Sequence, residues 1–588
     1  MPIKLTTIAG ARDAALHIKT ASGVVPAALW LKTATGVVLI SGSGYDIYVD
    51  SVSGSDANDG TTPGKAFATL SAARTAALAI GNGVSIGLTA GSRWREDLDL
   101  SALSGITISA VGEGQMPIID GSRSLSNGDL TQNGTYPSVY QTTVMQTMPE
   151  AYLSVWEDDQ ILKWETSLAS CASTPGTFYV SGPSASSGKS AAGSQIIYIH
   201  ASDGSDCRSN GRGYDVTDPT RQGALTFGTG TVSHIHTRRN SRADGSLVGA
   251  GTVIGCVMSD GVKHNALLTH GEYRGCVGWH RHTDVRTGCI SLEFYKSDGT
   301  GYECLYTDCV VVGNARSSTL GGAVSAYGGH NQGDGTYYDR VTINRCSAED
   351  VSVFIGSTAN DGGATACYAH NVEGFCGLSI KEAPSVAMTD MWLHLDASWM
   401  VSVRGFTSAI ASLTLDGLRA YIGASPSFDG VFLLNGDVTF TKSVIVMDCD
   451  KSWSTVAGGG TGGGTVSMQE TVVDLRKNNC NVYDWYPVGG MVRGYHANNV
   501  YYDNAGSLSW TIDGVKKASP TAYLSEYPES GTSLSNPGVT DPASGNFALA
   551  SPPNSAGLER LDVSYTPIPS TLSDAITYAA GIRQPPGE

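Results

Sequence analysis

Carboxylate and imidazole side chains recur through residues 293–394, where they could serve as general acids and bases. The acidic side chains in this stretch include Glu293, Asp298, Glu303, Asp334, Asp339, Glu349, Asp350 and Asp361. Glu349 lies three residues after Cys346, and the same offset in the following repeats falls on His370, His394 and Tyr421. A carboxylate stacked with an imidazole would form an acid–base pair, because each charge shifts the pKa of the other. The catalytic candidates are Glu293, Glu349, Asp339 and His370, and a hydrogen-bonded surface ladder is the simpler interpretation.

The element that positions these side chains is a short repeat with a cysteine or apolar residue at a fixed place. Its column reads Cys256, Cys276, Cys309, Cys346, Cys367, Met391, Leu418, Val444 and Val472. Most gaps in the column are 20 to 28 residues, and two gaps of 33 and 37 residues leave room for longer loops. A unit this short cannot bury a core alone, but stacked units bury a continuous one. The spacing therefore predicts a solenoid whose rungs are coils of a parallel β-helix.

A second strand in each rung is predicted by one pattern, in which a serine lies between two apolar residues. The pattern occurs in Ile290–Glu293, Val351–Phe354, Leu378–Lys381 and Val401–Arg404. Alternate residues of a strand point to opposite faces. The fourth positions would then form an outward column of Glu293, Phe354, Lys381 and Arg404, with a solvated salt-bridge ladder as the plainer alternative.

Composition agrees with many short strands. Charged residues make up 15% of the chain and glycine contributes 73 residues, while the formal net charge of −17 argues against a nucleic-acid partner. The chain starts without a charged and apolar leader and has no apolar run of eighteen residues, so neither secretion nor membrane insertion is expected. Five of the twelve cysteines fall in the buried column and none forms a CxxC pair, so we expect free thiols and neither a metal nor a cofactor.

The chain divides into five segments. Residues 1–42 hold a short repeat, Ile18–Val25 and Leu31–Val38, and form a small β module. Residues 43–120 carry a helix over Phe67–Ile80 that would cap the rod, followed by its first strands. Residues 121–250 break the period and predict a β insertion, residues 251–502 form the main β-helix, and residues 503–588 form a last strand near Asn546–Ser551 and an irregular tail.

Three stretches carry a resemblance to a known family. They are the opening Tyr48–Gly60 with Pro63 and Phe67–Leu70, the closing segment Asp541–Leu549, and the N-terminal module. The chain resembles a bacteriophage tailspike or tail-fibre protein with a right-handed parallel β-helix of the polysaccharide-lyase-like group. The resemblance covers most of the chain and is specific for fold, whereas such rods host lyases, hydrolases and plain binding proteins alike.

The resemblance implies a virion protein, assembled in the host cytoplasm as a homotrimer and joined to the phage tail or baseplate through residues 1–42. Its rod would bind a bacterial surface polysaccharide, either capsule or lipopolysaccharide glycan, and depolymerise it, with glycoside hydrolysis preferred. Two carboxyl groups across the scissile bond are needed for hydrolysis. The alternatives are a receptor-binding tail protein without catalysis and a lyase acting by β-elimination, the latter either in a phage protein or in a cell-encoded extracellular enzyme.

The candidates for substrate binding are aromatic, cationic and imidazole side chains near the acidic residues. They are Tyr327, His330, Phe354, Lys381, Arg404 and His394. Tyr327 and His330 fall in the longest rung loop, Asn314–Tyr337, which we expect to project over the groove. The pairs His234 with His236 and His280 with His282 have a spacing that suits a divalent metal, but surface histidines are the better interpretation because no third ligand matches.

Overall fold

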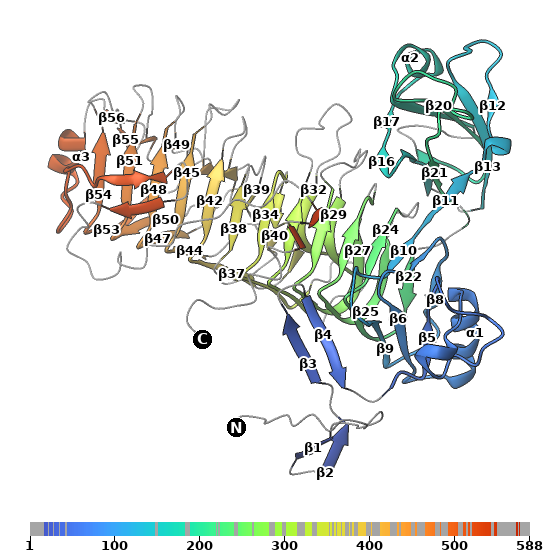
Figure 1. The fold of residues 1–588 in the computed structure, drawn as a ribbon. Coiled ribbons are helices and arrows are strands. Elements are labelled where there is room, and N and C mark those ends of the chain that lie inside the picture. The colour runs from blue at the N-terminus through green and yellow to red at the C-terminus, as the bar shows by residue number, and fades with distance from the viewer. Residues whose placement is uncertain are drawn as a thin grey trace.

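Short parallel strands stack coil upon coil into a rod, and a separate β insertion stands off one end of it (Figure 1). These features come from a computed structural model. The structure describes residues 17–20, 23–26, 29–33, 36–41, 44–147, 151–182, 189–218, 220, 224–239, 245–261, 264–280, 289–296, 302–313, 324–331, 338–351, 353–355, 358–359, 362–365, 367–370, 375–376, 379–380, 386–395, 401–402, 412–423, 432–433, 437–448, 453–454, 465–476, 482–483, 492–503, 510–512, 515–517, 520–542, 546–549, 572–573 and 575–576.

One long side of the rod is a 13-stranded parallel sheet, here called the first sheet. Its strands are β7 (Arg93–Trp94), β10 (Ile118–Asp120), β24 (His236–Arg238), β26 (Val257–Ser259), β28 (Val277–Trp279), β31 (Val310–Val312), β34 (Ser347–Glu349), β38 (Tyr368–His370), β42 (Trp392–Leu395), β45 (Arg419–Ile422), β48 (Val444–Met447), β51 (Val472–Leu475) and β54 (Val500–Asp503). Each coil adds one strand, so residues one coil apart lie opposite each other, about 4.8 Å away.

The first strands of the second sheet are β5 (Ile47–Val49), β6 (Ser85–Thr89), β8 (Leu98–Leu100), β9 (Ile106–Val111), β22 (Leu225–Phe227), β23 (Gly230–Ser233), β25 (Leu247–Ile254) and β27 (Ala266–Arg274). Two ladders, β8 with β22 and β9 with β23, join at β25, and the sheet divides again after β27, whose two halves pair with different strands. One branch contains β29 (Cys289–Lys296), β32 (Val324–Asn331), β35 (Val353–Ile355), β39 (Phe375–Cys376), β43 (Val401–Ser402) and β46 (Phe432–Leu433). The other contains β30 (Glu303–Thr307), β33 (Arg340–Asn344), β37 (Gly362–Thr365), β41 (Val386–Thr389), β44 (Ser412–Asp416), β47 (Asp437–Thr441), β50 (Thr465–Gln469) and β53 (Val492–Ala497).

A sharp corner joins the two sheets in each coil. Between β25 and β26 the corner residue is Gly255 with φ 60°, and the equivalent residues Asp308 and Arg345 have φ 54° and 50°. A single residue in this left-handed region turns the chain abruptly, after which the next strand begins. The residue that follows each of these corners belongs to the predicted column. Its members Cys256, Cys276, Cys309, Cys346 and Cys367 are all buried in the core. The predicted parallel β-helix is therefore confirmed.

The predicted column is wrong by one position in its last two members. Val444 and Val472 pair in register with Arg419 and belong to the outward row, while Ser443 and Thr471 occupy the position that follows the corner. The outward row is itself apolar there, because the C-terminal segment covers it. An all-apolar strand such as Val444–Met447 gives no alternation from which to set the register.

The rod begins with a capping helix, as predicted. α1 (Leu70–Ile80) follows η1 (Pro63–Lys65), and Leu70, Ala73 and Ala77 are buried against the first coils. The Thr69 hydroxyl accepts a hydrogen bond from Ala72 N and starts the helix. Before the rod, each copy of the N-terminal repeat forms an antiparallel hairpin: β1 (His17–Thr20) with β2 (Gly23–Pro26), and β3 (Leu29–Thr33) with β4 (Gly36–Ser41).

The insertion is shorter than predicted, because residues 225–254 already pair with the rod. It has its own apolar core, which includes Phe178 and Ile197. Its elements are β11 (Ser122–Leu125), η2 (Asn127–Asp129), β12 (Thr131–Gln132), β13 (Tyr140–Gln146), β14 (Ala151–Tyr152), β15 (Val155–Glu157), β16 (Gln160–Ile161), β17 (Lys163–Trp164), α2 (Leu168–Ser173), β18 (Thr177–Ser181), β19 (Lys189–Ser190), β20 (Gly193–His200) and β21 (Tyr214–Thr217).

The C-terminal segment forms a strand where the last strand is predicted, near Asn546–Ser551, and most of the predicted irregular tail lies outside the described residues. Its elements are β55 (Trp510–Ile512), β56 (Val515–Lys517), α3 (Pro520–Glu526), β57 (Val539–Asp541) and β58 (Asn546–Leu549). Four short strands from earlier in the chain lie outside the two long sheets: β36 (Thr358–Ala359), β40 (Ser379–Ile380), β49 (Trp453–Ser454) and β52 (Val482–Tyr483). Val539 of β57 packs on the outward valines of β48, β51 and β54, and Ala575 packs on those of β26, β28 and β31. The segment therefore contacts two regions of the outer face of the first sheet. Within the described residues, every helix is too short or too polar to span a membrane.

Candidate functional site

The predicted stack around Glu349 exists in the backbone. Glu349 at the end of β34 lies opposite His370 of β38, which lies opposite His394 of β42 and then Tyr421 of β45. The Glu349 side chain is 8% exposed, and Tyr421 donates a hydrogen bond to Asp448 Oδ2 at 3.5 Å. The side chains of His370 and His394 lie outside the described residues, so the acid–base role of this column stays a prediction.

The predicted outward column of the second sheet is wrong in its register. Glu293 lies opposite Gly328, two residues out of step with Phe354, because Ser325 pairs with Val353. Glu293 is buried rather than exposed, and its Oε2 lies 2.6 Å from His264 Nδ1, a contact that becomes an ion pair when the imidazole is protonated. Lys381 and Arg404 lie outside the described residues.

The prediction for Tyr327 is also wrong, because its ring belongs to the core. The expected loop contains strand β32, and Tyr327 donates hydrogen bonds to the carbonyls of Ser347 at 2.6 Å and Cys309 at 3.0 Å. His330 lies on the same strand opposite Tyr295, and its side chain is outside the described residues. Asp339 is exposed, and its backbone NH donates to the Tyr302 carbonyl at 3.0 Å.

The histidine pairs give no metal site in the described part of the chain. His236 and His280 are buried rather than on the surface, and burial lowers the pKa of each to about 3. His236 Nε2 contacts Ser259 Oγ at 2.8 Å, and His280 Nε2 contacts Ser291 Oγ at 3.0 Å. Among the residues that the structure describes, no cluster of three metal-binding side chains occurs.

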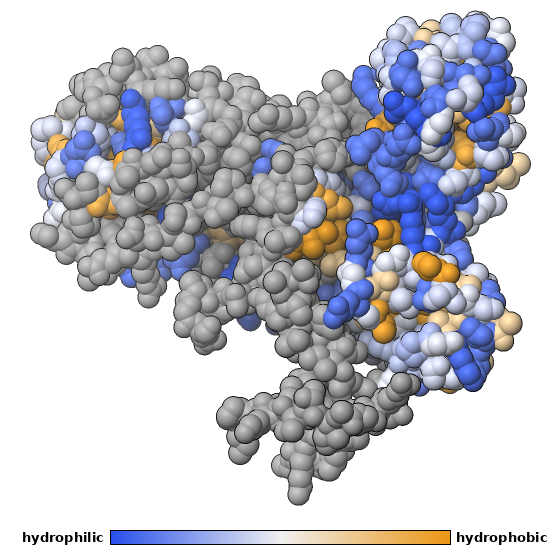
Figure 2. Space-filling model, in the orientation of Figure 1, coloured by the Kyte–Doolittle hydropathy of each residue, from blue (hydrophilic) through white to orange (hydrophobic). Residues whose placement is uncertain are grey.

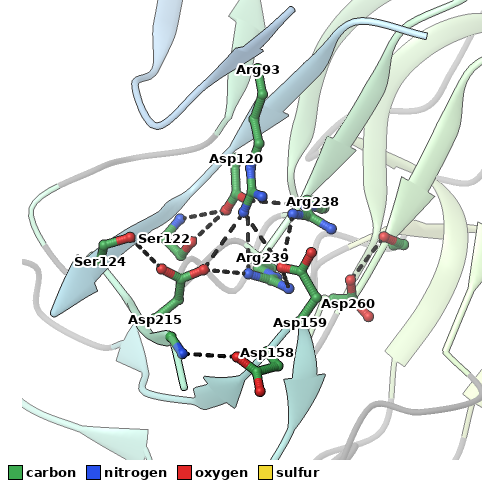
Figure 3. A network of polar contacts seen from close by, with 12 residues as sticks. Arg93, Asp120, Ser122, Ser124, Asp158, Asp159, Asp215, Arg238, Arg239 and Asp260 are labelled. Carbon is green, nitrogen blue, oxygen red and sulfur yellow. Dashed lines mark hydrogen bonds and ion pairs between the residues drawn. The ribbon is translucent and has the colours of Figure 1, made fainter. Parts of the chain in front are cut away.

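The densest group of charged side chains lies where the insertion meets the first coils of the rod (Figure 3). We call this group the junction site. It comprises Arg93, Arg95, Asp120, Asp159, Asp215, Arg238, Arg239 and Asp260. Figure 2 shows a broad hydrophilic surface in the same region, between the insertion and the first coils.

The rod supplies the buried centre of the junction site. Asp120 at the end of β10 is fully buried and accepts hydrogen bonds from Arg93 at 2.7 Å, Arg238 at 2.9 Å and Ser122 Oγ at 2.6 Å. Burial alone would raise the pKa of Asp120, but the charges of Arg238 and Arg239 outweigh it and hold that pKa well below its usual range. Asp120 therefore stays ionised and fixes the direction of the arginines.

The insertion supplies two further carboxylates. Asp215 on β21 accepts from Arg95 at 2.9 Å and from Arg239 at 2.9 Å. Asp159 lies in the tight turn between β15 and β16, where Asp158 and Asp159 have φ 46° and 66°, the pattern of a type I′ hairpin. Asp158 Oδ1 accepts from Gly213 N at 2.8 Å, which ties the turn to the insertion.

Asp159 is the accessible carboxylate of the junction site. Its side chain is 51% exposed, although it contacts Arg239 at 2.6 Å and Arg238 at 3.3 Å. Burial of the inner part would raise its pKa, but the two arginines lower it overall. Arg239 is fully buried, and its guanidinium lies 4.8 Å from the centre of the Trp156 ring, so its position is fixed by packing as well as by charge.

Asp260 has the opposite electrostatic setting. It follows β26 at φ 58°, one coil beyond Arg239, and its Oδ2 accepts from Ser259 Oγ at 3.0 Å. Burial raises the pKa of Asp260 despite the opposing charges of Arg239 and Arg238. Figure 3 shows Asp159 and Asp260 on the same side of the arginine pair. One site thus combines a carboxylate whose pKa is lowered with one whose pKa is raised.

The sequence prediction missed the junction site, because its members are far apart in the chain. Asp120 and Arg238 are 118 positions apart, and Asp159 reaches the arginines only when the insertion folds back on the rod. Two local signals were present: the adjacent arginines Arg238 and Arg239, and the spacing of Arg93 and Arg95, which places both side chains on one face of an extended segment.

No protein-family model and no curated protein matches the sequence. Solved structures with a similar chain path include XylC in complex with xylose, at 10% identity and a TM-score of 0.36, covering 84% of this chain and 87% of that one. They also include a lacto-N-biosidase from Eubacterium ramulus at 11% identity and a TM-score of 0.27, covering 83% and 68%. The tailspike protein of Pseudomonas phage LKA1 has 9% identity and a TM-score of 0.28, covering 79% and 77%. At these values the likeness carries no argument about substrate or reaction.

Proposed function

We propose that this chain is a phage tail protein that binds a bacterial surface polysaccharide and depolymerises it by glycoside hydrolysis at the junction site. The observation that carries the proposal is the contrast between Asp159 and Asp260. Glycoside hydrolysis needs one carboxyl group that donates a proton and one that is ionised. Groups whose surroundings push their pKa values apart are the usual way in which a protein provides both at one pH.

The two carboxyl groups take different roles. Asp260, whose pKa is raised by burial, is the group that would donate a proton to the leaving glycosidic oxygen. Asp159 is half exposed and ionised beside Arg238 and Arg239, and it acts as the base or nucleophile on the other side of the glycosidic bond. Arg93 and Arg95 have side chains that are 29% and 36% exposed, so their guanidinium groups can donate hydrogen bonds to sugar oxygens.

The test is incubation of the purified protein with surface polysaccharides from candidate hosts, followed by mass spectrometry. We expect saturated oligosaccharides from the wild type and a loss of rate of at least about 100-fold in Asp159→Asn and Asp260→Asn. Asp206→Asn is the matched control, because Asp206 also pairs with an arginine of the insertion, Arg208, outside the junction site. Circular dichroism would verify that the variants are folded.

Other outcomes reassign the chemistry. Products with unsaturated ends, detected by ultraviolet absorbance, would show elimination and point to Arg93 and Arg95 as the cations that neutralise a uronate. A polymer that binds but stays intact would favour a receptor-binding tail protein without catalysis. Loss of activity in Glu349→Gln, with Asp159→Asn still active, would move the acid–base role to the column of Glu349 and His370.

The remaining parts of the proposal concern assembly. The described strands between residues 17 and 41 form two hairpins that are small for independent stability, and this supports a role of residues 1–42 in attachment to a phage tail or baseplate protein. We propose a homotrimer of rods in the virion. Sedimentation of the purified protein would test the trimer, and deletion of residues 1–42 should leave polysaccharide cleavage intact while abolishing incorporation into virions.

A further inference from the structure

Two tyrosine rings stack on the outer face of the insertion, away from its core. Tyr179 of β18 and Tyr198 of β20 lie directly opposite each other in neighbouring antiparallel strands. Their ring centres are 5.8 Å apart and their planes differ by 26°, so the two rings stack on each other and form one aromatic unit. Both rings are partly exposed. Neither contributes to the insertion core, which uses the alternate residues Phe178 and Ile197.

One end of this face is covered by α2, and the rest of the face, from the tyrosine pair onward, is at least partly exposed. α2 covers the end of the face at Thr177 and His200, both buried, and the Cys171 carbonyl of α2 lies 2.8 Å from His200 Nδ1. The next row across the strands consists of Gln141, Tyr198 and Tyr179, and the row after it of Thr143, Ile196 and Ser181. All six residues are at least partly exposed. The tyrosine pair therefore begins where the cover of α2 ends.

The open rows contain no ionisable carboxylate or amine, although the chain as a whole has a net charge of −17. At their edge, Glu165 is paired with Lys163 at 2.9 Å and accepts from Ser170 Oγ at 2.6 Å, so its charge is balanced. Gln141 lies beside Tyr198, and its Oε1 accepts from Asn133 Nδ2 at 2.8 Å, which orients the amide. The face thus offers aromatic surface, an oriented amide and hydroxyl groups, without net charge.

We propose that this face, formed by Gln141, Thr143, Tyr179, Ser181, Ile196 and Tyr198, is a binding platform for an uncharged stretch of polysaccharide. The apolar faces of neutral sugar rings would stack on the two tyrosines, and their hydroxyl groups would bond to Gln141 and Thr143. A charged polymer gains nothing here that compensates for its loss of hydration. The choice of a glycan as ligand rests on the proposed function, but the platform lies apart from the junction site and needs no catalysis.

The arrangement of the insertion suits such a role. In Figure 1 the insertion projects from the rod, with β16 on the side that faces the rod and β20 farther away. A polymer held on the outer face would be bound by the same insertion that supplies Asp159 and Asp215 to the junction site. The platform would raise the local concentration of substrate and contribute to affinity rather than to the rate of the chemical step.

The test is affinity gel electrophoresis with the full chain carrying Asp159→Asn, so that the polymer stays intact. The gels contain dextran, galactomannan or xyloglucan as neutral probes and alginate as the acidic probe. We expect retardation by at least one neutral polymer and an apparent affinity about tenfold weaker after Tyr179→Ala or Tyr198→Ala. Tyr198→Phe should retain binding, because it keeps the ring. Tyr495→Ala, which removes a tyrosine that is 62% exposed on the rod, is the matched control and should have no effect.

Each failure has a distinct signature. A protein that no neutral polymer retards, or one whose retardation survives both alanine substitutions, overturns the platform. Retardation by alginate alone, lost in the alanine variants, overturns its neutral specificity. If the platform binds while wild-type protein leaves every host polysaccharide intact, the proposed hydrolysis fails and the platform stands. Thermal melting of the two alanine variants would separate loss of a ligand contact from loss of folding.

Discussion

Asp260 shows how a single residue can be suited to chemistry and costly to the fold. Burial raises its pKa, and a raised pKa means that the ionised form is less stable in the folded protein than in water. The folded chain therefore keeps a proton on Asp260 at pH values at which the unfolded chain has already released it. A proton donor is available at the junction site as a direct consequence of this destabilisation.

The sign of the resulting pH dependence follows from linkage. An aspartate in the unfolded chain titrates near about pH 3.9. Because the folded value is higher, the contribution of Asp260 to the free energy of unfolding falls as the pH rises from 3.9 through the folded pKa. Asp260→Asn cannot ionise, so it should gain stability relative to wild type across this window. Urea unfolding of both proteins at several pH values between about 3.5 and 8 measures the difference.

Asp206 provides the opposite case as a control. A hydrogen bond from Arg208 lowers the pKa of Asp206, so its contribution is present above the unfolded value and is lost as the pH falls through the folded one. Asp206→Asn should therefore lose stability relative to wild type as the pH rises. A difference between Asp260→Asn and wild type that does not change with pH would contradict the raised pKa of Asp260.

At the scale of elements, the outer face of the first sheet depends on the C-terminal segment. Ala575 is fully buried against Val257, Val277 and Val310, while Leu572 and Ile576 pack at the edges of the same contact. Ala575→Asp would bury a carboxylate among valines, so the segment should detach instead. We expect a local loss of about 1–3 kcal/mol in the free energy that holds the segment. Limited proteolysis should cleave the C-terminal segment faster, while the melting temperature of the rod changes little.

Ser573→Asp is the control for this substitution, because Ser573 is exposed in the same short segment. It adds the same charge without burying it, so proteolysis should stay at the wild-type rate. If the rod itself melts cooperatively at a much lower temperature in Ala575→Asp, the segment is part of the core and not a separate covering layer.

The contact between the C-terminal segment and the first sheet also explains which parts of the inward column could be predicted from the sequence. Cys256 and the four cysteines that follow in its column were identified because the same residue type recurs at the inward position, although outward neighbours such as Val257 are apolar too. Val444 and Val472 were misplaced because residues far along the chain, such as Val539, make their outward face apolar as well. The junction site could not be predicted from periodicity at all, because a hairpin turn of the insertion must dock on the rod before Asp159 contacts Arg238. Contacts of this kind leave no periodic signal in the sequence.

At the scale of the whole molecule, the insertion is a module placed within one coil of the rod. The strands on either side of it, β10 and β24, pair directly, with Ile118 opposite His236. The chain leaves and returns at one point, where Asp218 N donates to the Gly121 carbonyl at 3.1 Å and Gly121 N donates to the Arg238 carbonyl at 2.9 Å. The stacking of coils is therefore continuous without the insertion, whereas the junction site takes Asp159 and Asp215 from the insertion and its remaining members from the rod.

Excision of the insertion should separate the scaffold from its function. Two coils further along the rod, the connection from β26 to β27 uses only residues 260–265, so a loop of that length can replace residues 121–224. Because each coil of a solenoid is stabilised by its neighbours, the excised protein should fold and melt cooperatively as a β protein. Arg238 and Arg239 would lose Asp159 and Asp215 but gain access to water, which limits the loss in the free energy of unfolding. Circular dichroism and calorimetry measure folding, while polysaccharide cleavage and retardation by neutral polymers should both be lost. A folded variant that still cleaves would place the chemistry on the rod, in the column of Glu349, and a variant that aggregates would show that the rod requires the insertion to fold.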